Sequence, residues 1–261
     1  MSAHVLLEHD QGLAVITLNQ PDRANVLDLP TSAALIDAVG RVAADESVRA
    51  VLLRARGRQF CAGGDITDFG RAGDELAAML DRHIPALHRA IHTLATLPVP
   101  VVSALNGPIG GGGIGLALCA DIVVAAASMK LRGGYSAIGL TPDVGSSWLL
   151  ARRVGQARAK EIFFTNETLD ARECLTLGVV SRVVPDAELA ETALALARKL
   201  ARGATGSLRR IKHLVDGAHA ASLEQQLALE HRYMVESGSS ADAREGVAAF
   251  VERREPRFGG K

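Results

Sequence analysis

The sequence predicts an α/β protein in which crossover helices cover a β-sheet. Over residues 5–126, short apolar runs typical of strands alternate with longer segments of helical periodicity, and this alternation favours repeated β–α–β units. Two of the strand-like runs lead into glycine-rich turns. Because glycine tolerates positive φ and lets other groups approach the backbone closely, these turns are the first candidates for a binding site.

The first half of the chain gives a definite order of elements. Asp10-Gln11-Gly12 is expected to form a turn between two strands, and Thr31 is the expected N-cap of the first helix. Pro85 should kink or split a later helix, because proline removes a backbone donor and clashes with the preceding turn. The expected elements are strands at 5–7 and 14–18, a helix at 31–44, a strand at 50–54, a helix at 74–97, a strand at 100–105, a helix at 114–119 and a strand at 121–126.

The character of the chain changes after about residue 145, where helical segments follow one another with a single short strand among them. We therefore divide the chain into a core at 1–200 and a C-terminal helical region at 201–261. No low-complexity linker separates the two. The expected elements are helices at 146–154, 157–164, 171–177, 186–201, 208–220, 223–236 and 242–253, with a strand at 178–184.

Composition argues against several classes of function. The 261 residues carry 29 basic and 29 acidic side chains, so no overall field favours nucleic acid or an anionic membrane as a partner. We expect no secretory signal, and no apolar run approaches the roughly 18 residues that a membrane span needs. Cys61, Cys119 and Cys174 are odd in number and widely spaced, which argues against disulfides and for a cytoplasmic location.

The two glycine-rich turns carry the most specific signal. The first, at 60–66, reads Phe-Cys-Ala-Gly-Gly-Asp-Ile, and the second, at 106–113, reads Asn-Gly-Pro-Ile-Gly-Gly-Gly-Gly. Two such turns can aim two free N–H groups at one point, which is the arrangement of an oxyanion hole. The two segments resemble the first and second signatures of the crotonase (enoyl-CoA hydratase/isomerase) superfamily. The similarity covers nearly the whole chain, from Val15 to Arg254.

This resemblance implies a fold, an assembly and a ligand. The family fold is a spiral of ββα repeats followed by helices that mediate trimer formation, often as a dimer of trimers. The resemblance therefore implies a homotrimer or hexamer that acts on an acyl-CoA thioester, typically in fatty acid metabolism. It implies no metal and no separate cofactor, because coenzyme A is part of the substrate.

The family's two oxyanion-hole donors correspond to Gly64 and Gly112. Their N–H groups would stabilise the enolate that forms when a proton leaves the carbon beside a thioester. The alternative is that both turns need glycine only for their sharp geometry. The resemblance also implies substrate contacts. It places Ala62 and Ile66 at the adenine, Arg23 at a phosphate, and Asp65 and Gly111 elsewhere in the site. It places Phe258 and Lys261 near the nucleotide of a neighbouring subunit, although Arg23, Phe258 and Lys261 are equally compatible with ordinary surface positions.

Two positions depart from the hydratases of the family. Hydration in this family uses two glutamates that position a water molecule and move its protons. The corresponding residues here are Gly115 and Tyr135, and neither can act as a carboxylate base. The standard two-glutamate mechanism is therefore not open to this sequence.

Asp143 supplies a carboxylate nearby, within the segment 139–145. Dienoyl-CoA and epoxide-CoA isomerases of the family carry aspartate at this point, where the hydratases usually carry glycine. We therefore predict that Asp143 is the single base of an enoyl-CoA isomerase and moves a proton between two carbons of the acyl chain. Two alternatives stay open: Asp143 could instead cap the helix at 146–154, and Tyr135 could be a pocket wall rather than a hydrogen-bond donor to the substrate.

Other interpretations are weaker. The second turn also satisfies G-x-G-x-x-G, but it lacks the acidic residue that a nicotinamide-binding fingerprint requires about 20 residues later. His88 and His92 have a spacing that can bind metal, yet no third ligand is evident, so a solvated helix face is expected. Cys61 is interpreted as a packing residue. An enoyl-CoA hydratase of atypical mechanism and a catalytically inactive acyl-CoA-binding protein remain the alternative functions.

Overall fold

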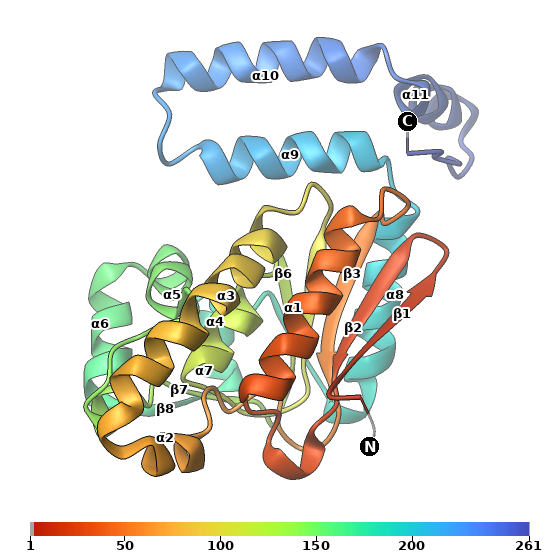
Figure 1. The fold of residues 1–261 in the computed structure, drawn as a ribbon. Helices are drawn as coiled ribbons and strands as arrows, with labels where there is room; N and C mark the ends of the chain where they lie inside the picture. The colour runs from red at the N-terminus through yellow and green to blue at the C-terminus, as the bar shows by residue number, and fades with distance from the viewer. Residues whose placement is uncertain (1–2, 261) are drawn as a thin grey trace.

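A six-stranded sheet forms the centre of the computed structural model, which describes residues 3–260 (Figure 1). Its strands are β1 (Val5–Asp10), β2 (Leu13–Leu18), β3 (Ala50–Ala55), β4 (Val101–Leu105), β6 (Ile122–Ala126) and β9 (Arg182–Val184). They lie in the order β1-β2-β3-β4-β6-β9. β1 is antiparallel to β2, and every other neighbouring pair is parallel. Parallel neighbours require crossover connections, so the predicted α/β class is confirmed.

Helices cover both faces of this sheet. α1 (Leu29–Ala44) packs against α3 (Leu76–Thr96) on one face, whereas α8 (Leu189–Ala201) contacts β3, β4 and β6 on the other (Figure 1). In β2, Ala14 and Ile16 belong to the apolar cluster that contains α1, while Leu13 and Val15 pack with α8. All six residues of β2 are buried, which explains why its sequence is apolar apart from Thr17.

A smaller three-stranded sheet holds the second glycine-rich turn. Its strands are β5 (Ile109–Gly110), β7 (Lys130–Arg132) and β8 (Thr168–Asp170). The sequence predicts none of them, because two or three residues are too few to show a periodicity. α4 (Gly112–Leu118) follows β5 closely, and α5 (Ser146–Val154) packs against α4. This part of the fold therefore brings the second turn close to the segment that precedes α5.

Two helices differ informatively from expectation. Asp28, rather than Thr31, is the N-cap of α1, because its carboxylate accepts the N–H of Thr31 at 2.8 Å. α3 continues through Pro85 as one helix, so the predicted split is wrong. Pro85 lies on the exposed side, and the helix is anchored beyond it by four buried side chains, those of Leu87, Ala90, Ile91 and Leu94.

The C-terminal helices lie beyond one end of the large sheet (Figure 1). Some of their large apolar side chains face solvent, among them Met234, which is 75% exposed, and Phe250, which is 86% exposed. Apolar surface of this kind is typical of a protein–protein interface, and the trimer or hexamer stays a prediction. The remaining helices are α2 (Ile66–Ala72), α6 (Gln156–Thr165), α7 (Ala171–Thr176), α9 (Thr205–Gly217), α10 (Leu223–Gly238) and α11 (Ala241–Glu252).

None of the helices within residues 3–260 combines the length and the hydropathy needed to cross a membrane.

The burial of the cysteines gives a test of this packing. Cys61, Cys119 and Cys174 are all buried, and burial raises the thiol pKa of each to about 12. Because the thiolate is the reactive form, we predict no reaction of the folded protein with the thiol reagent DTNB at pH 8. All 3 thiols should react after unfolding in guanidinium chloride. Rapid labelling of Cys61 in the folded protein would show that the first glycine turn is not packed as described.

Candidate active site

The two glycine-rich turns meet main chain to main chain. Cys61 forms an isolated β-bridge with Ile109, and the N–H of Gly110 donates to the carbonyl oxygen of Cys61 at 3.1 Å. Gly63 has φ of +88°, and a Cβ atom there would lie 2.8 Å from both Gly110 O and Gly112 N. Real Cβ atoms essentially never approach so closely. Glycine at 63 is therefore required for the two turns to touch.

The amides of Gly64 and Gly112 are unoccupied donors. Neither donates to an acceptor among residues 3–260, and both residues line a cavity of about 720 Å³. Gly112 is the first residue of α4, after Gly111 at φ +50°. The N-terminal amides of a helix carry partial positive charge. Two free N–H groups at one cavity can stabilise a negatively charged oxygen atom.

Asp143 lies directly beside Gly112. A Cβ atom on Gly112 would be 3.3 Å from Asp143 Oδ1, so the carboxylate borders the second turn. The carboxylate does not cap α5, because the N-cap is Gly145 and no side chain caps this helix. Asp143 contributes only its carbonyl oxygen there, which accepts the N–H of Ser146 at 2.8 Å. Its side chain lines the cavity.

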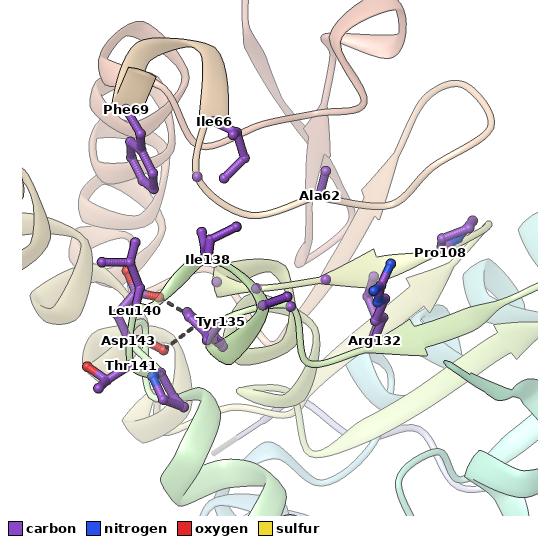
Figure 2. A pocket seen from close by; sticks show the side chains of 18 of the residues that line it. Ala62, Ile66, Phe69, Pro108, Arg132, Tyr135, Ile138, Leu140, Thr141 and Asp143 are labelled. Atoms are coloured by element: carbon purple, nitrogen blue, oxygen red, sulfur yellow. Dashed lines mark hydrogen bonds between the residues drawn. The ribbon is translucent and has the colours of Figure 1, made fainter. Parts of the chain in front are cut away.

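Tyr135 is a hydrogen-bond donor to this carboxylate. Its hydroxyl group donates to Asp143 Oδ1 at 2.7 Å (Figure 2), and only 7% of the residue is exposed. Burial raises the pKa of Tyr135 strongly, and the negative charge of Asp143 raises it further. The hydroxyl group therefore stays protonated through the usual assay range and can keep donating to Asp143. Tyr135 also forms part of the cavity wall.

Ser146 connects the carboxylate to the second turn and is a site residue that sequence reasoning missed. Its hydroxyl oxygen is 3.1 Å from Tyr135 Oη and accepts the N–H of Gly115 at 3.0 Å. Because the Tyr135 hydrogen is donated to Asp143, the single Ser146 hydrogen is available either for Tyr135 Oη or for the carbonyl oxygen of Gly111, which is 3.3 Å away. Ser146 is fully buried. The network therefore runs from Asp143 through two hydroxyl groups to the backbone of the glycine turn.

Backbone occupies the space at Gly115, where a hydratase of the resembling family would carry its first glutamate. A Cβ atom on Gly115 would lie 1.9 Å from the carbonyl oxygen of Val144 and 2.7 Å from its carbonyl carbon. No side chain fits without movement of the segment that carries Asp143. The packing of Val144 against Gly115 thus explains why position 115 carries no carboxylate.

The other candidate residues fall into two groups. Ala62, Ile66 and Gly111 line the same cavity as Asp143 (Figure 2). Three others, Asp65, Arg23 and Phe258, are not among its lining residues. Asp65 is the N-cap of α2 and forms an ion pair with Arg23, which also pairs with Asp28. Phe258 contacts the site of Gly246 on α11, and Lys261 lies outside the described residues.

The cavity has an apolar end and a basic end. Phe69, Leu80 and Ile84 line it near α2 and α3, whereas Lys130 and Arg132 line it on β7. Figure 2 shows Arg132 on the opposite side of the pocket from Phe69 and Leu140. His88 lines the cavity too, and its Nε2 accepts the N–H of Val144 at 3.0 Å. His88 is exposed, as expected for a solvated helix face, but it also borders the cavity and bonds the Val144 amide.

Comparison with known proteins identifies the family. The family model described as Enoyl-CoA hydratase/isomerase matches residues 8–261, and the chain belongs to this family. It is 40% identical over 266 residues to the 1,2-epoxyphenylacetyl-CoA isomerase of Escherichia coli (strain K12), with 100% of each chain covered. It is 30% identical to the short-chain-enoyl-CoA hydratase of Clostridium acetobutylicum, covering 96% of this chain and 95% of that protein.

Solved structures agree with this assignment. The crystal structure of an enoyl-CoA hydratase from Polaromonas sp. JS666 superposes with a TM-score of 0.90 at 33% identity, covering 97% of this chain and 99% of that one. The fold is therefore the crotonase fold. Relatives named as isomerases and relatives named as hydratases both match, so the reaction must be inferred from the site.

The packing at Gly115 predicts the result of restoring a hydratase glutamate. Gly115→Glu should lower the free energy of unfolding by roughly 1–3 kcal/mol or more, because overpacked side chains force the backbone to shift. Denaturant unfolding measures this loss. Gly40→Glu on α1 is the matched control, since a Cβ atom there meets nothing within 4 Å. A stable Gly115→Glu variant that hydrates 2-enoyl-CoA would contradict the described course of Val144.

Proposed function

We propose that this protein is an enoyl-CoA isomerase that moves a double bond in an acyl-CoA thioester by a 1,3-proton shift. The observation that carries the proposal is that Asp143 supplies the one carboxylate among the described residues lining the cavity, directly beside Gly112. A single base can remove a proton and return it elsewhere, whereas the family's hydration mechanism needs two carboxylates.

The reaction can be written with all atoms in balance. The Asp143 carboxylate removes a proton from the carbon between the thioester and the double bond of a 3-enoyl-CoA. The electron pair left behind is delocalised onto the thioester oxygen, which the N–H groups of Gly64 and Gly112 stabilise. The protonated Asp143 then returns the proton two carbons further along the chain. The product is a 2-enoyl-CoA, and the carboxylate is regenerated.

Preorganised donors account for much of the expected rate. In comparable sites the loss of one oxyanion donor costs about 3–4 kcal/mol. Tyr135 assists by donating to Asp143 Oδ1, which fixes the carboxylate while the other oxygen, Oδ2, can accept the substrate proton. The opposed apolar and basic ends of the cavity suit a ligand with a hydrocarbon acyl group and an anionic nucleotide.

The role of Asp143 gives a direct test. Asp143→Asn should reduce conversion of a 3-enoyl-CoA to the conjugated thioester by about 10²–10⁴-fold, because an amide cannot cycle between base and acid. Absorbance of the conjugated product measures the rate, and calorimetry should show that the thioester still binds. Asp74→Asn, at an exposed residue, is the control. Retained activity in Asp143→Asn, or efficient water addition to crotonyl-CoA by the unmodified protein, would refute the isomerase proposal.

The hydroxyl group of Tyr135 can be tested separately. Tyr135→Phe removes a hydrogen bond to a charged acceptor, which is worth about 1.5–3 kcal/mol. We therefore expect kcat to fall by about tenfold or more, with KM changed little. Tyr233→Phe is the matched control, because that hydroxyl group bonds His213 at 2.9 Å on the exposed C-terminal helices. An unchanged kcat in Tyr135→Phe would show that this residue only lines the pocket and does not assist Asp143.

A further inference from the structure

The turn that carries Asp143 has an unusual backbone. Val144 has φ of +52° and Gly145 has φ of +75°, and the carbonyl oxygen of Asp143 accepts the N–H of Ser146 across them. Positive φ at two central residues is typical of a type I′ turn. A β-branched residue in this region is an outlier. Such strain persists only where the surroundings impose it.

Three contacts impose this conformation on Val144. Its side chain is buried against the site of Gly112, and its carbonyl group fills the space beside Gly115. The third contact is the one polar contact that its amide makes within residues 3–260: the N–H donates to Nε2 of His88 at 3.0 Å. His88 comes from α3, 56 residues earlier in the chain.

We infer that His88 is a positioning residue, which aims the Asp143 carboxylate at the glycine turn by holding the Val144 amide. If this acceptor were lost, the peptide between Asp143 and Val144 could rotate toward an unstrained conformation. The rotation becomes possible because the free energy of the backbone strain is comparable to that of one hydrogen bond. It would carry the carboxylate away from Gly112. The inference rests on the proposed function only in that Asp143 is taken as the base.

The chemistry of the ring supports this role. An imidazole nitrogen can accept a hydrogen bond through its lone pair, and Nε2 of His88 is placed to accept from the Val144 amide. His88 and His92, one turn further along α3, are both exposed, but His92 has no comparable side-chain bond among the described residues. The two histidines therefore differ in the bond to Val144 and not in exposure, and His92 offers a matched control.

Kinetics give the first arm of the test. His88→Leu should lower kcat by about 10–100-fold, since a displacement of about 1 Å at the base can cost that much, while the KM for the 3-enoyl-CoA stays within about twofold. His88→Gln offers an amide oxygen as acceptor and should recover part of the loss. His92→Leu and His92→Gln should behave as the unmodified protein. A wild-type kcat in His88→Leu would overturn the inference.

Strain relief gives the second arm. Glycine adopts positive φ without cost, so in a Val144→Gly background the further change His88→Leu should reduce kcat less than it does alone. Such non-additivity is the expected sign of coupled residues. An equal fold-loss in both backgrounds would show that His88 does not act by holding the strained turn.

Amide hydrogen exchange gives an arm that does not depend on the reaction. The Val144 amide should exchange more rapidly in His88→Leu than in the unmodified protein, and His92→Leu should leave it unchanged. If the protein proves to have no isomerase activity but this difference is seen, the positioning role stands and the proposed function fails. If Val144 exchanges at the same rate in both variants, the positioning role fails whatever the activity.

Discussion

The contact between two stretches of glycine backbone is the constraint on which the site depends. At Gly63 the main chain of the second turn lies where any side chain would begin, 2.8 Å from the Cβ position. This closeness lets two amides from separate crossovers of the sheet line one cavity. Because backbone atoms make the contact, its geometry is fixed by the fold and does not have to be rebuilt by flexible side chains when a ligand arrives.

The polar groups around Asp143 form the second layer of this design. Tyr135 and Ser146 are both buried, and their hydroxyl groups find partners in Asp143 and in the backbone of the glycine turn. Buried polar networks are rigid when every member is satisfied and costly when one partner is lost. Asp143 itself is only partly buried. Buried hydroxyl groups thus hold the carboxylate on one side, while the carboxylate also lines the cavity.

The sequence reveals local features of this site and misses the contacts that depend on tertiary structure. Gly64, Gly112 and Asp143 could be proposed because each stands in a short, recognisable segment, and the cavity brings them together. Ser146 bonds a residue 31 positions away and His88 one 56 positions away, and no periodicity encodes such partners. The strands of the small sheet escaped because they are two or three residues long.

The main chain of Val144 within the space beside Gly115 has a consequence for how reactions diversify on this fold. An acid cannot be added at position 115 by substitution alone, because the peptide atoms of Val144 already occupy the place. The path of residues 139–145 would first have to change, through an insertion, a deletion or several concerted substitutions. A change from isomerase to hydratase activity therefore requires a different loop conformation. Sequence variants along a stepwise evolutionary route would be expected to fold poorly before any new catalysis could be selected.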